Sequence, residues 1–378
     1  MLSLTLANAE ILTPIGLTRA KLSFEAGRIA AAPAGRSVDL TDFMILPGVV
    51  DLHGDGFERH LAPRRGALRD LGEGLASLDA ELAANGITTA VLAQFFSWEG
   101  GMRSPDFAEG LAGALDAARP RLLSDMKLQL RLETHLLDAY DRAEALIVRA
   151  GIGYAVFNDH LPHKALAEGK RPPRLTGQAL KSGRSPEAHL ALLQELHGRS
   201  GDVPGALAEL AARLAARGVV MGSHDDATPE ARAAYRAMGA TIAEFPETAE
   251  AAQTAHAAGD SVILGAPNVV RGGSHSGKVS AADLVAQGFC DALVSDYHYP
   301  SLRQAALALA DEIGLVDAWA LVSSRPAQVL GLTDRGTLTP GQRADLVILE
   351  RETGRVGGTI SGGRIAYLSD KAAERFLD

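Results

Sequence analysis

Short apolar runs alternate with longer amphipathic stretches over most of the chain. The runs are rich in β-branched residues, which is typical of buried parallel strands, and they cover residues 49–53, 87–93, 127–133, 154–158, 219–223, 241–245, 262–266 and 292–295. The stretches between them repeat their apolar positions with a helical period, as in residues 77–84, 205–217, 249–258 and 302–313. Thr228-Pro229-Glu230 is a helix start signal and Asn85-Gly86 a helix stop signal.

This alternation predicts an α/β fold in which strands and helices follow one another. Eight strand–helix units within residues 47–337 favour a (β/α)8 TIM barrel. A doubly wound open sheet is the alternative, because eight strands alone do not prove that the sheet closes.

The two ends of the chain have a different pattern, with short strands separated by turn signals at residues 2–6, 17–24, 27–31, 344–349 and 364–368. Neither end is long enough to bury a core of its own. We therefore expect residues 1–46 and 338–378 to pair into one small β-sandwich domain, next to a barrel domain of residues 47–337.

The weakest pattern lies in residues 161–200, which we interpret as an inserted loop. It contains the basic residues Lys164, Lys170, Arg171, Arg174, Lys181 and Arg184. Long loops in compact domains often act as lids or binding elements, so a lid is a hypothesis for this segment.

Composition narrows the function classes. The 378 residues include 37 Lys and Arg and 46 Asp and Glu, which gives a net charge of −9. Binding to nucleic acid or to an anionic membrane needs a broad basic surface, so we expect neither. Cys290 is the single cysteine, which excludes an internal disulfide and a cysteine-based zinc site. The sequence has no long apolar span and no secretory signal pattern, and we expect a cytoplasmic protein.

Potential metal ligands follow five of the predicted strands. His53 and Asp55 are two residues apart in extended backbone and can reach one ion from the same side. The other strand ends carry Glu133 with His135, Asp159-His160, His224-Asp225-Asp226, and Asp296. In a barrel these ends converge on the catalytic face, so the pattern predicts a divalent metal site with room for two ions. For Asp225 or Asp226, capping of the helix that starts at Pro229 is the alternative.

Basic residues gather in two predicted loops. Gly272 to Lys278 resembles a phosphate-binding P-loop, but Val279 stands where a hydroxyl residue would hold magnesium, and we reject an NTP-hydrolysing P-loop fold. Its glycines with Arg271, His275 and Lys278 still suit an anion, and a flexible loop is the alternative. The segment after the first barrel strand contains Arg59, His60, Arg64 and Arg65, for which phosphate contacts and simple surface solvation are equally favoured.

Several segments resemble the amidohydrolase superfamily. They are Leu-Pro-Gly-Val-Val-Asp-Leu-His at 46–53 and Gly-Thr-Leu-Thr-Pro-Gly-Gln-Arg-Ala-Asp-Leu-Val at 336–347. Within the superfamily, the segments at 223–228, 242–246, 265–277 and 295–297 are similar to the α-D-ribose 1-methylphosphonate 5-triphosphate diphosphatases of the C–P lyase pathway. The resemblance runs nearly from end to end and is most specific in residues 266–277.

The resemblance implies roles for the strand-end residues. His53 and Asp55 would hold one metal ion, Glu133 would bridge, and His160 and His224 would hold the other. Asp296 would contact metal and take the proton from the attacking water. The implied ions are zinc, with manganese or iron as alternatives. The implied substrate is a ribose triphosphate. From the basic loops we expect its phosphates to be contacted by Arg59, Arg64, Asn268, Arg271, Gly272, Gly273, His275 and Lys278.

Two departures from the diphosphatase pattern concern substrate contacts. The family usually has His-Thr-Asp-Asn at the first site, where this chain has His53-Gly54-Asp55-Gly56, and Lys278 replaces a smaller polar residue. An amidohydrolase that cleaves a C–N bond is the alternative enzyme, and a metal-storing or scaffold protein is the non-enzymatic alternative. The sequence leaves the oligomeric state open, a homo-oligomer included, as well as contact with C–P lyase components.

Overall fold

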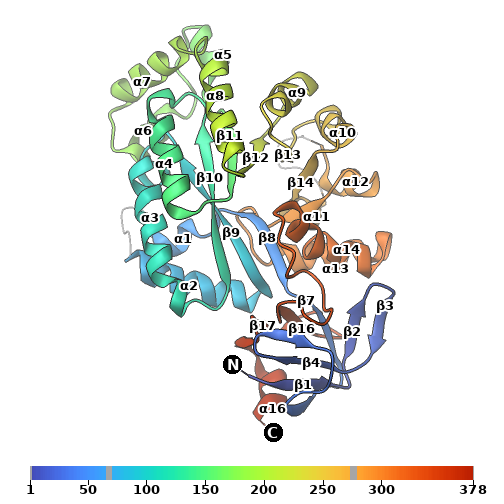
Figure 1. The fold of residues 1–378 in the computed structure, drawn as a ribbon. Helices are drawn as coiled ribbons and strands as arrows, with labels where there is room; N and C mark the ends of the chain where they lie inside the picture. The colour runs from blue at the N-terminus through green and yellow to red at the C-terminus, as the bar shows by residue number, and fades with distance from the viewer. Residues whose placement is uncertain (1, 65–69, 273–278, 378) are drawn as a thin grey trace. The chain divides into compact units, whose positions relative to one another are not determined.

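The computed structural model describes residues 2–64, 70–272 and 279–377, which form two compact units. The first unit contains Met1–Leu92, Ala117–Lys127 and Ser261–Asp378, and the second contains Ala93–Asp116 and Leu128–Asp260. In Figure 1 the second unit is the part of the chain coloured from cyan-green to yellow.

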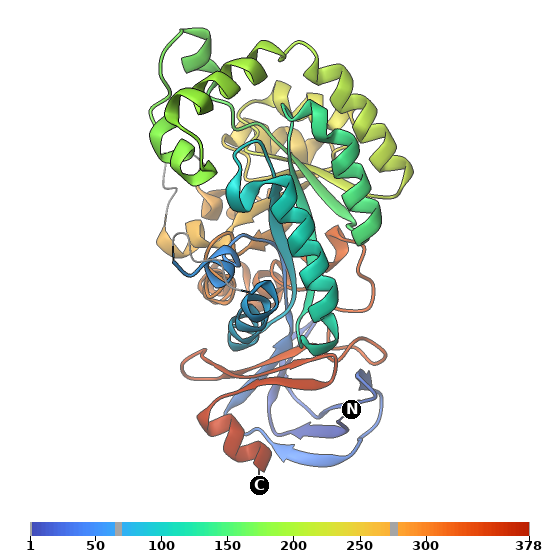
Figure 2. The ribbon, with the colours of Figure 1, turned by 90° about the vertical axis from the view of Figure 1, so that its left-hand side faces the viewer.

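Strands from both ends of the chain form two mixed sheets in the first unit. One sheet has the order β5-β4-β1-β6 and the other β18-β17-β16-β7-β2-β3. Figure 2 shows the blue amino-terminal and red carboxyl-terminal strands side by side, as the antiparallel pairing of β7 with β16 requires. The strands are β1 Leu4–Ala7, β2 Glu10–Thr13, β3 Gly16–Arg19, β4 Leu22–Glu25, β5 Arg28–Ala30, β6 Arg36–Asp39, β7 Phe43–Pro47, β16 Leu346–Glu350, β17 Val356–Ser361 and β18 Arg364–Leu368.

A shared apolar core joins the two sheets. Phe24, Val38 and Ile45 from the amino-terminal part pack with Ile348 and Ile360 from the carboxyl-terminal part, and all five are buried. The predicted β-sandwich is therefore confirmed as part of the fold, while its exact domain boundaries stay a prediction. One expectation was wrong: residues 17–24 are not a single strand, because β3 and β4 belong to different sheets.

All eight predicted barrel strands are present and follow one another in chain order in one sheet. They are β8 Val49–Gly54, β9 Ile87–Phe96, β10 Asp125–Glu133, β11 Tyr154–Asn158, β12 Val220–His224, β13 Ile242–Glu244, β14 Ser261–Gly265 and β15 Ala292–Val294. The strand pairs described are parallel, and a bridge between Gly54 and Asp296 connects the first strand with the segment after the last. The predicted barrel is confirmed.

Helices follow most of these strands. They are α1 Glu58–Leu61, α2 Leu71–Ala84, α3 Pro105–Ala118, α4 Tyr140–Ala150, α8 Val203–Ala216, α9 Pro229–Ala237, α10 Ala249–Ala257, α11 Ala266–Arg271, α12 Ala281–Ala286, α13 Ser301–Ile313, α14 Leu315–Ala320, α15 Ser324–Val329 and, at the end of the chain, α16 Asp370–Leu377. The Thr228 side chain accepts from the backbone N–H of Ala231 and caps α9, as the start signal predicts. Asp226 instead pairs with buried Arg232 at 3.2 Å.

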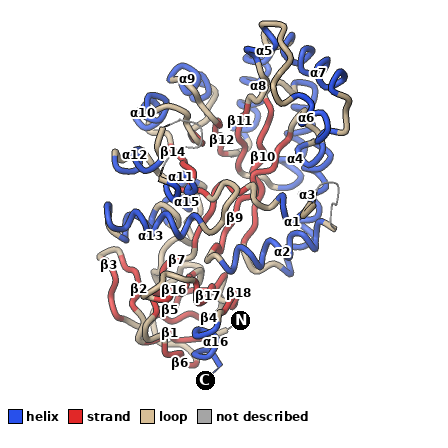
Figure 3. The backbone as a smooth tube through the Cα atoms, turned by 180° about the vertical axis from the view of Figure 1, so that it is seen from behind, coloured by secondary structure: helices blue, strands red, loops and turns tan. Residues whose placement is uncertain are grey.

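The segment 161–200 is not the loop that its weak pattern suggests. It contains three helices, α5 His163–Ala167, α6 Leu175–Ser182 and α7 Pro186–Gly198, which Figure 3 shows in blue. Leu161, Leu175, Leu193 and Leu196 pack around Trp98, which follows β9. The tertiary contacts of this small apolar core stabilise helices that are too short to be stable alone.

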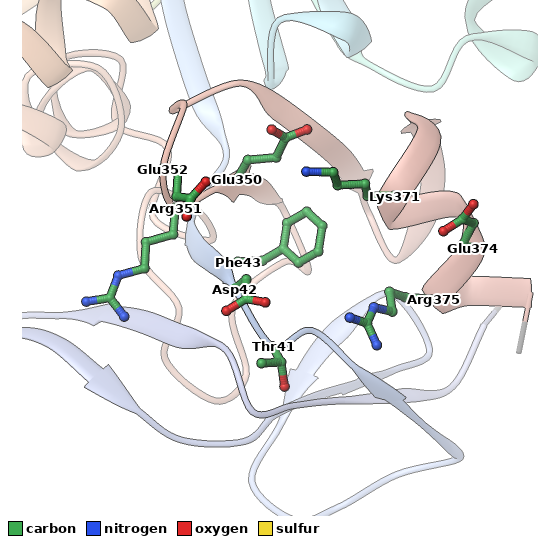
Figure 4. A pocket seen from close by; sticks show the side chains of 9 residues that line it. All are labelled: Thr41, Asp42, Phe43, Glu350, Arg351, Glu352, Lys371, Glu374 and Arg375. Carbon is green, nitrogen blue, oxygen red and sulfur yellow. The ribbon is translucent and has the colours of Figure 1, made fainter.

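A separate cavity of about 430 Å³ lies at the sandwich (Figure 4). Its lining has charges of both signs and comprises Thr41, Asp42, Phe43, Glu350, Arg351, Glu352, Lys371, Glu374 and Arg375. Among the described residues, none of the helices is long and apolar enough to cross a bilayer.

Candidate active site

Three barrel strands are followed by a non-glycine residue in the left-handed backbone region. Asp225 follows β12, Phe245 follows β13, and Asp296 lies two residues after β15, with φ angles of 58°, 52° and 54°. Such a conformation costs about 1–3 kcal/mol at each residue and is concentrated at functional sites. Two of these strand ends, those of β12 and β15, are ends that the sequence marks by its histidines and acids.

In the first unit, the ends of β8 and β15 bring His53, Asp55 and Asp296 together. The Asp296 backbone N–H donates to the His53 carbonyl at 3.0 Å, and the Asp55 backbone N–H donates to the Asp296 carbonyl at 2.8 Å. His53 is fully buried, whereas Asp55 and Asp296 are partly exposed. Three predicted metal ligands therefore share one small region, and two of them are open to solvent.

The buried Asp51 carboxylate is hydrogen-bonded to both of these strand ends. The Ser295 hydroxyl donates to Asp51 Oδ2 at 2.5 Å, and the backbone N–H groups of Ser295 and His53 donate to Oδ1 at 3.0 and 3.3 Å. Burial raises the pKa of Asp51, and these hydrogen bonds offset only part of that effect. Asp51 thereby fixes the backbone at His53 and at Ser295, which directly precedes Asp296.

Tyr299 fills the space beside the two glycines of this segment. A Cβ atom at Gly54 would lie 2.9 Å from both Tyr299 Cε1 and Asp51 Oδ2, and one at Gly56 would lie 2.6 Å from Arg59 Nη1 and 3.2 Å from Tyr299 Cε2. Tyr299 is fully buried, and its hydroxyl has no hydrogen-bond partner in the described part of the chain. Burial raises the pKa of this phenol well above its usual range. The Tyr299 ring therefore leaves too little room for a Cβ atom at Gly54, while at Gly56 the nearest atom is the end of the Arg59 side chain.

In the second unit, Glu133 at the end of β10 contacts His160, which follows β11. His160 Nδ1 is hydrogen-bonded to Glu133 Oε1, and the His160 backbone N–H donates to Glu133 Oε2 at 3.2 Å. Trp98 Nε1 also donates to Oε2 at 3.2 Å. Burial by itself would lower the pKa of His160, but the hydrogen bond and charge of Glu133 outweigh it and raise this pKa. Glu99, Glu133 and His160 each offer a ligand atom at a spacing that suits a metal ion.

The protonation of His224 follows from its two neighbours. Its Nδ1 lies 3.0 Å from Glu244 Oε2, and its Nε2 lies 2.8 Å from Arg131 Nη2. Glu244 accepts and Arg131 only donates, so Nδ1 carries the proton and Nε2 presents a lone pair. Burial, and then the charge of Arg131, lower the pKa of His224 to about 4. His224 is therefore neutral at pH 7, with Nδ1 donating to Glu244 and Nε2 accepting from Arg131.

Glu244 is itself held by two donors. Gln129 Nε2 and the Tyr154 hydroxyl both donate to Glu244 Oε1 at 2.6 Å. The carboxylate is fully buried at the end of β13. With Oε1 occupied in this way, Oε2 is left to accept from His224.

The basic residues after β8 are partly engaged within the first unit. Arg59 Nη2 and His60 Nε2 both contact the Glu81 carboxylate, and Arg59 Nη1 donates to the Tyr297 carbonyl at 3.0 Å. Arg64 is exposed, and Arg65 lies outside the described residues. The contacts of Arg59 with Glu81 and Tyr297 explain its place in the fold, and phosphate binding by Arg59 and Arg64 stays a prediction.

The predicted anion loop follows β14 and the short helix α11. Arg271 is exposed; its Nη2 donates to Asn268 Oδ1 and its Nε to the Pro267 carbonyl, both at 3.2 Å. Gly272 ends the helix with a φ of 72°, a left-handed conformation that glycine adopts without strain. Three further predicted contacts, Gly273, His275 and Lys278, lie outside the described residues.

Comparison with known proteins assigns the family. A family model described as "Amidohydrolase family" matches residues 297–367. The chain is 33% identical over 328 residues to the alpha-D-ribose 1-methylphosphonate 5-triphosphate diphosphatase of Escherichia coli (strain K12), which covers 82% of this chain and 84% of that protein. The chain belongs to this diphosphatase family, within the amidohydrolase superfamily.

Solved structures share the fold at low sequence identity. An amidohydrolase from a Sargasso Sea environmental sample has a TM-score of 0.63 and 17% identity, and the match covers 100% of this chain and 96% of that chain. A putative prolidase from Bifidobacterium longum has a TM-score of 0.62 and 15% identity, with 99% and 97% covered. At these identities the likeness supports the barrel fold alone.

Four residues around the predicted metal ligands were missed by sequence reasoning: Asp51, Arg131, Glu244 and Tyr299. Asp51 and Arg131 each stand two positions before a predicted ligand in a strand, where alternation puts side chains on the same face. That spacing was a signal that could have identified both. Glu244 is an acid at the end of the predicted strand 241–245, the same signal that marked Glu133, whereas Tyr299 follows its strand without such a signal.

Proposed function

We propose that the chain hydrolyses α-D-ribose 1-methylphosphonate 5-triphosphate to α-D-ribose 1-methylphosphonate 5-phosphate and diphosphate. The 33% identity to the Escherichia coli diphosphatase over most of both chains is the observation that carries this proposal. Histidines and carboxylates at the strand ends support it, because they suit hydrolysis assisted by divalent metal ions. We place the reaction in the cytoplasm, in keeping with a single buried and free cysteine.

The donor atoms fit a divalent metal centre. His53, Asp55, Glu133, His160, His224 and Asp296 are the residues that would hold two ions, with zinc as the first choice and manganese or iron as alternatives. The Nδ1 atom of His224 is oriented by Glu244, as the outer nitrogen of a metal-ligating histidine is, and a bound ion would replace Arg131 at Nε2. Bound there, divalent ions polarise phosphoryl oxygens and lower the pKa of water.

The remaining steps belong to side chains of the protein. Asp296 accepts the proton of the attacking water, and its partial exposure leaves room for substrate. Arg271, with Asn268 beside it, neutralises negative charge on the phosphates, and Arg59, Arg64, His275, Lys278 and the glycines Gly272 and Gly273 complete the proposed contacts. One water is consumed, one P–O bond breaks, and diphosphate leaves.

The direct test follows diphosphate release from the ribose methylphosphonate triphosphate by the metal-loaded protein. Hydrolysis in ¹⁸O-labelled water shows which phosphorus is attacked, because attack at the α-phosphorus puts the label in the sugar phosphate. The competing hypothesis, cleavage of a C–N bond, predicts turnover of N-acyl or cyclic amide substrates. Turnover of those substrates without diphosphate release would overturn the proposal.

The role of Asp296 is tested by Asp296→Asn. The amide cannot accept the proton, so we expect the loss of nearly all diphosphate release with at least one metal ion retained, measured by kinetics and elemental analysis. Asp311→Asn, an exposed change on α13, is the matched control. Near-normal activity of Asp296→Asn would remove Asp296 as the base.

A further inference from the structure

A second cluster of possible metal ligands lies in the second unit, formed by residues that the proposed centre does not use. His135 follows β10, Asp159 follows β11, and His163 begins α5. One donor atom from each of the three lies within 4.8 Å of the others. His197, near the end of α7, contacts His163 through the two Nδ1 atoms at 2.9 Å.

Ser200 holds the outer nitrogen of His135. The Ser200 hydroxyl donates to the His197 carbonyl at 2.7 Å, so its oxygen is left to accept from His135 Nε2 at 3.1 Å. With the proton on Nε2, the Nδ1 atom of His135 presents a lone pair. That lone pair faces Asp159 Oδ1 at 3.5 Å, with the Thr134 hydroxyl at 3.3 Å.

His135 Nδ1 faces both the Asp159 carboxylate and the Thr134 hydroxyl, and a cation beside Asp159 would bind this nitrogen and the carboxylate together. His163 contacts the same carboxylate, because its Nε2 lies 2.9 Å from Asp159 Oδ2, where a bound cation would replace the imidazole proton, and its Nδ1 is held by His197. Each imidazole thus turns one nitrogen toward Asp159 and has the other nitrogen held by a neighbour. This is the pattern of metal-ligating histidines whose outer nitrogen is oriented by a hydrogen bond.

We propose that His135 Nδ1, Asp159 and His163 Nε2 bind one divalent cation such as zinc. This site is separate from the proposed catalytic centre. Two imidazoles and a carboxylate are ligands that zinc prefers, at about 2 Å from the ion, so ligand atoms in a tetrahedral site lie roughly 3.3 Å apart. Rotation of the His163 and Asp159 side chains, which are 37% and 33% exposed, closes the remaining distance. The same exposure leaves the fourth position open to water.

An ion at this site would connect three parts of the chain. It would link the ends of β10 and β11 to α5, and through His197 and Ser200 to the end of α7. The helices of residues 161–200 otherwise depend on a small apolar core around Trp98, whose Nε1 donates to Glu133. The proposed ion is therefore a structural clamp that holds this insert in place beside Glu133.

The test counts zinc ions in the full-length protein after loading and dialysis. His163→Asn and His135→Asn should each lower the zinc content by one equivalent per chain. His256→Gln, an exposed change on α10, is the matched control and should leave it unchanged. Wild-type zinc content in both cluster variants would overturn the proposal.

A second measurement separates the two metal sites. The double variant His53→Asn and His224→Asn lacks one histidine ligand of each ion of the catalytic centre, and we expect it to bind one Co²⁺ with a visible absorption band that disappears on adding His163→Asn. Ser200→Ala keeps all three ligands but frees the His135 tautomer, and should weaken zinc binding about 10-fold. A double variant without the cobalt band, or unchanged affinity in Ser200→Ala, would contradict the proposed site.

Discussion

The hydrogen bonds around Glu244 lead to a sharp prediction for Glu244→Gln. This substitution keeps the shape of the side chain but replaces one acceptor oxygen by an NH₂ donor. Tyr154 and Gln129 both donate to the Oε1 position, so the oxygen of the introduced amide stays there. Its NH₂ group then faces Nδ1 of His224, which already carries a proton.

The conflict between two donors forces one of two rearrangements. Either His224 moves its proton to Nε2, the nitrogen that would bind the metal, or the amide turns over and leaves the Tyr154 hydroxyl without an acceptor. Each outcome leaves one buried polar group unsatisfied, which costs about 1–3 kcal/mol. Since about 1.4 kcal/mol corresponds to a factor of ten, we expect metal affinity to fall about 10- to 100-fold.

The assay is a competition between the protein and a chromophoric chelator for zinc, together with the rate of diphosphate release at saturating and at limiting zinc. Glu244→Gln should lose activity mainly at limiting zinc. Glu230→Gln, an exposed change in the first turn of α9, is the matched control and should behave as the wild type.

A second substitution should restore the zinc affinity that Glu244→Gln loses. Adding Tyr154→Phe removes one of the donors, and Gln129 can then turn its own amide, whose oxygen has no hydrogen-bond partner in the described part of the chain. The introduced amide can now offer its oxygen to His224, so the double variant should recover most of the lost affinity. Wild-type zinc affinity in Glu244→Gln, or a double variant weaker than the single one, would refute this explanation.

Three further predictions concern stability, each measured by denaturant unfolding. Gly54→Ala places a Cβ atom 2.9 Å from Tyr299 and should lower the free energy of unfolding by about 1–3 kcal/mol, with partial recovery when Tyr299→Leu is added. Arg232→Met leaves the buried Asp226 carboxylate without its cation and should cost about 3–5 kcal/mol; a loss below 1 kcal/mol would contradict the pairing. Burial lowers the pKa of His189, so this side chain takes up a proton more readily in the unfolded chain than in the folded protein. The free energy of unfolding should therefore fall as the pH drops below about 6.5, the ordinary pKa of histidine. His189→Leu should flatten this pH dependence, and an unchanged slope would exclude His189 as its cause.

Local patterns predicted the barrel strands because their information lies in neighbouring residues. β-branched runs such as Tyr154–Asn158 and capped helices such as Pro229–Ala237 indicate their own conformation, and all eight strands are present. The same reasoning failed where contacts between distant residues decide the structure. Residues 17–24 divide between two sheets, and residues 161–200 form helices because Leu175 and Leu193 pack against Trp98.

The sequence by itself predicted which residues would carry the chemistry, because a parallel barrel brings all strand ends to one face. His53 with Asp55 and Glu133 with His160 could be named from that rule alone. Only the tertiary structure decided the state of these groups. The proton of His224 is placed by Glu244 and Arg131, which lie on other strands, and hydrogen bonds between strands leave no trace in the spacing of residues along one of them.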